Sequence, residues 1–283
     1  MLIMTKILAG IVTYNPDIRR LYENITSIVN QVHEVVIIDN ASCNYKEIEQ
    51  FRKIHNVKIL HNSENKGIAK ALDQILDYAK QNGYEWFLTL DQDSVMFSDA
   101  VKEYEKCFSY ENVAIIAGSY INRGQDYKQS TTNDSQIIFT DFCITSGSLC
   151  NVNIINDVGG FAEQLFIDCV DTELCIRIIK NEYKILMINK PMFIHELGNS
   201  KEYNFIGKKI TVFNESPIRH YYMSRNLLWL NREYGYKRAI RYYFTYILKI
   251  IFFEAEKRRK LKAYFWGTYD YFHNNFGKSL RTI

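Results

Sequence analysis

The chain has 283 residues, of which 47% are hydrophobic, and a formal net charge of +3 at neutral pH. A chain of this size can build a core without disulfides, and its six cysteines show neither a C-x-x-C pair nor a zinc-ligand spacing, so we interpret them as reduced thiols of a cytoplasmic protein. No uncharged run approaches the roughly 18 to 20 residues of a membrane span, and "MLIMTKILAGIVTYN" is interpreted as a first strand, not a signal peptide.

Charge is distributed unevenly along the chain. Residues 201–283 contain 17 basic and 6 acidic residues, a net charge of +11, whereas residues 1–200 contain 18 basic and 26 acidic residues, a net charge of −8. We therefore expect two regions with different neighbours: a domain over residues 1–215 and a basic, aromatic helical extension over residues 216–283.

Apolar runs alternate with helical patterns through the first 90 residues. Asn15 and Pro16 are the predicted N-cap and first residue of the first helix. The alternation predicts an α/β fold in which parallel strands are joined by right-handed crossovers. Strands are predicted at residues 6–13, in "EVVIID", in "VKIL" and at residues 86–90, and helices at residues 17–31, before residue 54 and in "ENKGIAKALDQILDYAKQNG".

Polar residues follow each of these four strands, namely Tyr14, Asp39, Asn62 and Asp91. Alone, each could be a turn or capping residue. Because ligands bind at the carboxyl edge of open α/β sheets, their shared position predicts a ligand crevice there.

The fourth strand ends in "LTLDQDS", which places two carboxylates one residue apart. The sequence has no G-x-G-x-x-G after the first strand and no G-x-x-x-x-G-K-[ST], so a nucleotide diphosphate needs another counter-charge. Mg²⁺ or Mn²⁺ held by Asp91 and Asp93 would provide it. The alternative is a surface turn with a capping aspartate.

Further carboxylates and one histidine stand out later in the chain. Asp168, Asp171 and Glu173 precede or begin a predicted helix, where Asp171 could be an N-cap or a proton acceptor. His195 ends a strand-like run and could be structural or a metal ligand.

The sequence resembles a bacterial family 2 glycosyltransferase of the GT-A fold, of the rhamnosyltransferase-like group. The resemblance spans about residues 6 to 230 and implies a mixed, mostly parallel sheet flanked by helices, followed by C-terminal amphipathic helices. The matching segments, in family order, are "IVTYNPD", "VVIIDNAS", "NKGIAKALDQ", "LTLDQDS", "ITSGSL", "VGGFAEQLFIDCVDTELCIR", "IHELG" and "SPIRHYYMSRNLL".

The resemblance implies a role for each matching residue. Asp171 aligns with the catalytic aspartate of the family's "ED" motif, although Val170 replaces the glutamate, which leaves Asp168 and Glu173 as alternatives. Donor contacts are implied for Tyr14, Asp39, Asn65, Lys66, Asp91, Tyr222 and Arg225, the last two closing over the diphosphate, and metal contacts for Asp91, Asp93 and His195.

The activity implied is an inverting, metal-dependent transfer of a sugar, with dTDP-β-L-rhamnose as the favoured donor. The acceptor would be a hydroxyl of a saccharide or lipid-linked saccharide in cell-surface polysaccharide synthesis. The alternatives are a GT-A enzyme with another nucleotide sugar, a sugar nucleotidyltransferase or a non-catalytic nucleotide-binding scaffold. A nucleotidyltransferase usually carries a basic glycine-rich loop after the first strand, and "TYNPDI" lacks one.

The run "YYFTYILKIIFF" is almost entirely apolar and is followed by Lys257-Arg258-Arg259-Lys260. It is too short and too charged to span a bilayer. We expect it to contact the inner face of the cell membrane, to form a homodimer, or to pack on the catalytic domain. Nothing in the sequence indicates binding to nucleic acid.

Overall fold

The computed structural model describes residues 5–124, 136–196, 201–205 and 207–283. It divides into two compact units. The first comprises Met1–Phe161 and Leu174–Glu196, and the second comprises Ala162–Glu173 and Leu197–Ile283. The first four residues of the segment interpreted as a strand lie outside the described residues.

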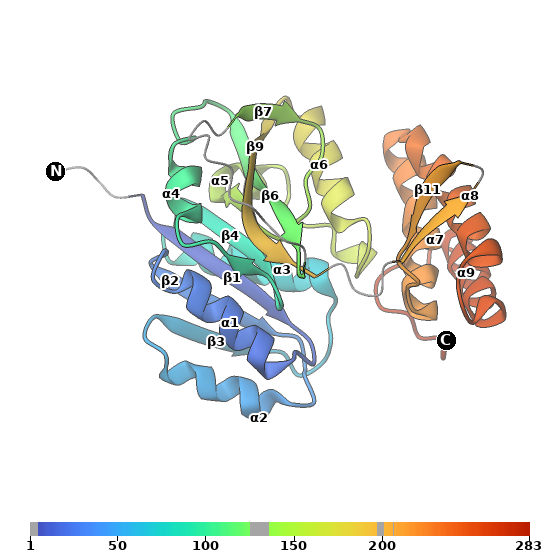
Figure 1. Cartoon of the computed structure of the whole chain (residues 1–283), viewed down its shortest axis with the longest axis horizontal. Helices are drawn as coiled ribbons and strands as arrows, with labels where there is room; N and C mark the ends of the chain where they lie inside the picture. The colour runs from blue at the N-terminus through green and yellow to red at the C-terminus, as the bar shows by residue number, and fades with distance from the viewer. Residues whose placement is uncertain (1–4, 125–135, 197–200, 206) are drawn as a thin grey trace. The chain divides into compact units, whose positions relative to one another are not determined.

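A mixed sheet forms the centre of the first unit (Figure 1). Within the described residues its order is β3-β2-β1-β4-β8-β6-β9-β5, with β7 paired to β9. The strands β1 to β4 run parallel, β8 is antiparallel to both β4 and β6, and β6 is parallel to β9. The bounds are β1 Ile7–Thr13, β2 Glu34–Asp39, β3 Val57–His61, β4 Trp86–Asp91, β5 Val95–Met96, β6 Val113–Asn122, β7 Ile137–Thr140, β8 Ser148–Asn151 and β9 Lys184–His195.

Helices cover both faces of this sheet, which confirms the predicted sheet flanked by helices. Ile7, Ala9 and Ile11 of β1 share one core cluster with residues of α1 and α4. On the opposite face, a Cβ at Gly10 would overlap the side chain of Ile75, so α3 packs directly on the β1 backbone. The helices are α1 Ile18–Ile28, α2 Tyr45–Ile48, α3 Ile68–Gln81, α4 Ala100–Glu105 and α5 Val152–Asp157, with 3-10 turns at Glu49–Lys53 and Glu163–Leu165.

The first helix is capped by a different residue from the one predicted. Asp17 is the N-cap, and its side chain accepts a hydrogen bond from the backbone N–H of Arg20. Asn15 instead adopts a left-handed conformation, with φ of 50°, and its side chain accepts from the backbone N–H of Cys43. Asn15 therefore joins the two loops after β1 and β2 instead of starting the helix.

The second unit consists mainly of helices. Helix α7 packs against both α8 and α9 (Figure 1). A buried ion pair supports this packing, since Glu254 contacts His220 of α7 and Lys260 of α9, each at 2.8 Å. The bounds are β10 Lys201–Phe205, β11 Lys208–Val212, α7 Pro217–Tyr234, α8 Lys237–Phe252 and α9 Lys257–Phe272, while α6 Val170–Lys180 begins in this unit and continues into the first. Among the described residues, none of the helices has both the length and the hydropathy needed to cross a bilayer.

Candidate functional site

The strand ends of the first unit align as predicted. In the sheet register Thr13 pairs with Asp39, Asp39 pairs with His61, and Val12 pairs with Asp91. Because these strands are parallel and adjacent, the polar residues after each strand lie along one edge of the sheet.

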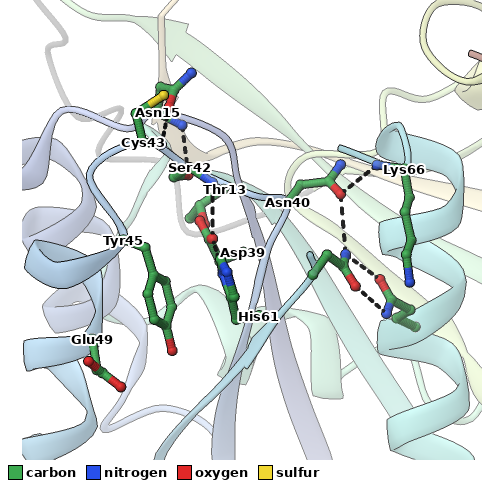
Figure 2. Close-up of polar contacts among 12 residues, drawn as sticks. Thr13, Asn15, Asp39, Asn40, Ser42, Cys43, Tyr45, Glu49, His61 and Lys66 are labelled. Atoms are coloured by element: carbon green, nitrogen blue, oxygen red, sulfur yellow. Dashed lines mark hydrogen bonds and ion pairs between the residues drawn. The ribbon is translucent and has the colours of Figure 1, made fainter. Parts of the chain in front are cut away.

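Asp39 is the centre of a polar network at this edge (Figure 2). Its carboxylate is fully buried and lies 2.9 Å from Thr13 Oγ1, 3.1 Å from the backbone N of Ser42 and 2.7 Å from His61 Nδ1. The His61 ring lies over Tyr45, with ring centroids 3.9 Å apart. Asp39 is therefore held rigidly by three neighbours, and the partly exposed His61 extends its network towards solvent.

A second network joins the loops after β2 and β3. Asn40 Oδ1 accepts from the backbone N of Lys66 at 2.9 Å (Figure 2). Asn40 Nδ2 donates to Asn65 Oδ1 at 3.0 Å. Asn62 bonds to both Asn40 and Gln74. These contacts hold the Asn65 side chain and the Lys66 backbone, and the Lys66 side chain is exposed.

Tyr14 lies at the start of the loop after β1. Its side chain is 50% exposed, and its backbone N donates to Gln92 Oε1 at 2.9 Å. Gln92 is the middle residue of the D-x-D tripeptide, so this bond joins the loops after β1 and β4.

Asp91, Asp93 and His195 occur together in the first unit. His195 is the last residue of β9, and its Nδ1 lies 4.0 Å from Asp91 Oδ2 and 3.3 Å from Ser94 Oγ. Ser146 Oγ accepts from the backbone N of Asp91 and contacts Ser94 Oγ at 2.8 Å. The residues of "IHELG" after Glu196 lie outside the described part of the chain.

The carboxylate of Asp93 has an oxygen that no described residue satisfies. Its Oδ1 is buried and has no hydrogen-bond partner among the described residues. Burial raises the pKa of the Asp93 carboxyl, while the nearby His195 acts in the opposite direction. A buried carboxylate oxygen without a donor is a site that a cation would satisfy.

The described residues do not complete a cation shell by themselves. Within the described residues, no group of three or more His, Cys, Asp and Glu side chains is arranged to hold a metal. Mg²⁺ is commonly bound by one or two carboxylates together with substrate phosphates, so Asp91 and Asp93 fit a site that a diphosphate completes.

The three candidate base carboxylates have distinct surroundings in the second unit. Asp168 receives two hydrogen bonds of 2.9 Å from Arg219 Nε, one to each oxygen. Glu173 is 1% exposed and accepts from the hydroxyl of Tyr234. Asp171 is partly exposed in the first turn of α6, and its Oδ1 accepts from the backbone N of Thr172 at 2.7 Å.

The backbone before α6 is unusual. Phe166, Asp168 and Cys169 all have φ between 62° and 65° although none is glycine. Such conformations cost of order 1–3 kcal/mol each and persist where the surrounding structure imposes them. Here Asn226 imposes them, because its Nδ2 donates to the carbonyls of Leu165, Ile167 and Asp168.

Arg225 is built into the core of the second unit, not presented to a ligand. It is fully buried, and its three nitrogens donate to five acceptors: Asn226 Oδ1 and the carbonyls of Gln164, Leu165, Asn275 and Gly277. Tyr222 is 2% exposed, stacks on Phe166 and accepts from the backbone N of Ser279. In this structure Tyr222 and Arg225 contact the loop before α6 and the C-terminal segment, and their expected contact with a diphosphate stays a prediction.

Comparisons with known proteins identify the family of the chain and show which of the expected site residues lie within the family match. Residues 9–162 match the family described as "Glycosyl transferase family 2". The chain is also 30% identical over 243 residues to the dTDP-rhamnosyl transferase RfbF of Shigella flexneri, and the match covers 81% of each chain. The chain belongs to glycosyl transferase family 2. Of the expected site residues, Tyr14, Asp39, Asn65, Lys66, Asp91 and Asp93 lie within the family match, whereas Asp171, His195, Tyr222 and Arg225 follow it.

Solved structures of other glycosyltransferases share the fold. The Staphylococcus aureus TarS fragment 1-349, in complex with UDP-GlcNAc, has a TM-score of 0.59 and 17% identity, over 92% of this chain and 79% of that chain. The mannosyltransferase PcManGT from Pyrobaculum calidifontis, in complex with GDP-Man and Mn²⁺, has a TM-score of 0.58 and 15% identity. That match covers 81% of this chain but 64% of the mannosyltransferase, less than two thirds of its length. At these identities the likeness establishes the GT-A-type fold that the sequence predicted.

The structure identifies further residues at the candidate site that the sequence analysis did not single out. Thr13, Ser42 and His61 position Asp39, and Arg219 engages Asp168. His61 could have been found from its place at the end of "VKIL", next to Asp39 in a parallel register. Arg219 lies within the quoted motif "SPIRHYY", but no spacing rule joins it to Asp168.

Proposed function

We propose that this family 2 protein is an inverting glycosyltransferase that moves L-rhamnose from dTDP-β-L-rhamnose to a hydroxyl of a saccharide or lipid-linked saccharide. The observation that supports this donor best is the match to a dTDP-rhamnosyl transferase over 81% of both chains. Cell-surface polysaccharide synthesis is the corresponding role.

The donor nucleotide is assigned to the strand edge of the first unit. Tyr14, Asp39, Asn65 and Lys66 are its proposed contacts. Asp39 acts through a network that fixes the edge, and the exposed Tyr14 ring and Lys66 ammonium are accessible to a base and a phosphate. These residues would therefore determine donor affinity more than the rate of transfer.

Asp91, Asp93 and His195 are proposed to hold Mg²⁺ or Mn²⁺. The buried oxygen of Asp93 and the 4.0 Å separation of Asp91 from His195 support this assignment. When bound, such a cation offsets the negative charge of the diphosphate. Ser94 orients His195 through Nδ1, and Ser146 fixes the Asp91 backbone.

Asp171 is the proposed base. As the acceptor oxygen forms its bond to the anomeric carbon and the bond to the diphosphate breaks, Asp171 takes the hydroxyl proton. Exposure supports the choice, since Asp171 is partly exposed, whereas the Asp168 side chain is 6% exposed and Glu173 is 1% exposed. The N-terminal end of α6 also favours an ionised carboxylate at Asp171.

A panel of donors tests the proposal. The protein is incubated with Mn²⁺, a saccharide acceptor and dTDP-β-L-rhamnose, UDP-GlcNAc or GDP-mannose, and release of nucleoside diphosphate is measured. We expect the highest rate with dTDP-β-L-rhamnose and an α-L-rhamnoside by NMR. Faster turnover of another donor would favour the second candidate, a family 2 enzyme with a different nucleotide sugar. Binding of nucleotides without turnover of any donor would favour a scaffold.

A further inference from the structure

Helix α8 has apolar side chains on two opposite sides. Ala239, Tyr243 and Ile250 are buried against the second unit. Phe244, Leu248 and Phe252 are 58%, 53% and 58% exposed and recur every four residues, so they form one stripe along the helix. Among the described residues, the side with Ala239, Tyr243 and Ile250 is buried and the side with Phe244, Leu248 and Phe252 is more than half exposed.

The same helix carries only positive charge. Its 16 residues include Lys237, Arg238, Arg241 and Lys249 and no acidic residue. Arg241 lies three residues before Phe244 and continues the exposed stripe towards the start of the helix. The stripe of α8 is thus basic at its beginning and apolar towards its end.

Helix α9 repeats this arrangement. Arg258, Lys262, Phe265, Tyr269 and Phe272 follow one another at intervals of three or four residues, and all five are exposed. Phe265 and Phe272 are 59% and 70% exposed. Two consecutive helices therefore each present basic residues followed by aromatic or aliphatic residues.

We propose that the exposed stripes of α8 (Arg241, Phe244, Leu248 and Phe252) and α9 (Arg258, Lys262, Phe265, Tyr269 and Phe272), here called the docking stripes, bind the surface of an anionic lipid bilayer. Basic side chains pair with anionic headgroups, and aromatic and aliphatic side chains enter the boundary between headgroups and acyl chains. This inference goes beyond the proposed function and depends on neither the donor nor the acceptor.

Charge decides between a bilayer and a second copy of the chain. Residues 201–283 carry 17 basic and 6 acidic residues, so two copies meeting through the docking stripes would bring like charges together. An anionic bilayer has the opposite charge. Since none of the described helices can cross a membrane, the contact would be peripheral.

Flotation of the full chain with vesicles tests the proposal. We expect binding to phosphatidylcholine vesicles that contain phosphatidylglycerol, weak binding to phosphatidylcholine alone, and a decrease with added salt. Phe244→Ser with Leu248→Ser should lower the partition coefficient at least about tenfold, because their apolar surface no longer enters the bilayer. Arg258→Glu with Lys262→Glu should lower it by a similar factor, at least about tenfold.

Matched variants in the first unit distinguish binding through the docking stripes from non-specific binding of the protein to vesicles. Lys46→Glu with Lys53→Glu makes the same charge change at exposed positions, and Phe139→Ser removes a phenylalanine that is 61% exposed. Both should bind vesicles as the unaltered protein does, and all variants should keep their melting temperature and donor affinity in solution.

Three outcomes would overturn the proposal. The first is an absence of binding to phosphatidylglycerol vesicles at low salt. The second is an equal loss of binding in the stripe variants and the first-unit variants. The third is a dimer in light scattering that dissociates in the Phe244→Ser, Leu248→Ser variant without any change in vesicle binding, because the stripe would then cover a second copy.

Discussion

Arg219 holds both oxygens of Asp168, with its Nε 2.9 Å from each. Both oxygens of Asp168 are thus occupied by a donor of Arg219, so this carboxylate is poorly placed to receive a proton from an acceptor. The pair therefore supports the proposal of Asp171 over Asp168, two carboxylates that the sequence alone left as alternatives.

Asp171→Asn should abolish most transfer while leaving the protein folded and able to bind donor. The substitution keeps size and capping ability but removes basicity, and loss of a general base typically costs about 10²- to 10⁴-fold in rate. Single-turnover kinetics, donor calorimetry and the melting temperature measure the three quantities. Asp168→Asn and Glu173→Gln are the parallel variants. If one of them stops turnover and Asp171→Asn does not, the base has been assigned to the wrong carboxylate.

Asp93→Asn should weaken metal-dependent donor binding without destabilising the fold. The buried Asp93 Oδ1 has no donor among the described residues, so removing the charge relieves an uncompensated burial. We expect an unchanged or higher melting temperature without metal, and a loss of the increase in donor affinity that Mn²⁺ gives the unaltered protein. Calorimetry with and without chelator checks both. Equal donor affinity with and without metal in the unaltered protein would rule out the assigned role of the D-x-D pair.

Arg225→Lys should lower the free energy of unfolding of the protein without selectively lowering its affinity for the donor. Lysine cannot supply the five donor contacts of the buried guanidinium, and the carbonyls left unpaired should lower the free energy of unfolding by about 2–4 kcal/mol. Arg232→Lys, at an exposed position of the same helix, should change it by less than about 1 kcal/mol. Urea unfolding measures the difference. A selective loss of donor affinity in stable Arg225→Lys protein would support the ligand-binding role that the family resemblance implies.

Asp270 should make the stability of the protein depend on pH in the acid range. Hydrogen bonds from Arg281 are the main cause that lowers the pKa of Asp270 from 3.8 to about 2, with a further bond from Tyr221. Because the folded state holds the proton less tightly, the stabilisation is complete above the unfolded pKa and is lost as the pH falls through the folded one.

The corresponding stabilisation at neutral pH is about 2 kcal/mol. Asp270→Asn should therefore be less stable than the unaltered protein at pH 7, and the difference should shrink between about pH 4 and pH 2. Urea unfolding at several pH values measures it, with Asp157→Asn as an exposed control. A difference that stays constant with pH would show that the ion pair is not its source.

The first half of the sheet could be predicted from the sequence because its signals are local. Apolar runs ending in Asp39 and Asp91 alternate with helical patterns, and that alternation determines parallel neighbours and a shared carboxyl edge. The position of β8 could not be predicted in this way. Its antiparallel place between β4 and β6 depends on pairing between strands distant in sequence, for which the chain carries no short-range signal.

Side-chain roles were harder to predict than strands. The resemblance implies a diphosphate contact for Arg225, and the sequence does not reveal that loop carbonyls surround its guanidinium in the structure. The N-cap was misassigned for a similar reason. Asn15 and Asp17 are both good caps, and a tertiary contact from Asn15 to Cys43 decided between them.

The polypeptide passes into the second unit for Ala162–Glu173, returns to the first for Leu174–Glu196, and then enters the second again. Leu165 and Asp168 therefore depend on Arg225, Asn226 and Arg219 for their conformation, although some 50 to 60 residues separate them along the chain. A chimera that exchanged only the C-terminal helices between two relatives would combine a loop from one parent with the anchoring side chains of the other. The C-terminal helices and residues 162–173 should therefore be exchanged together, so that the loop and the side chains that anchor it come from the same parent.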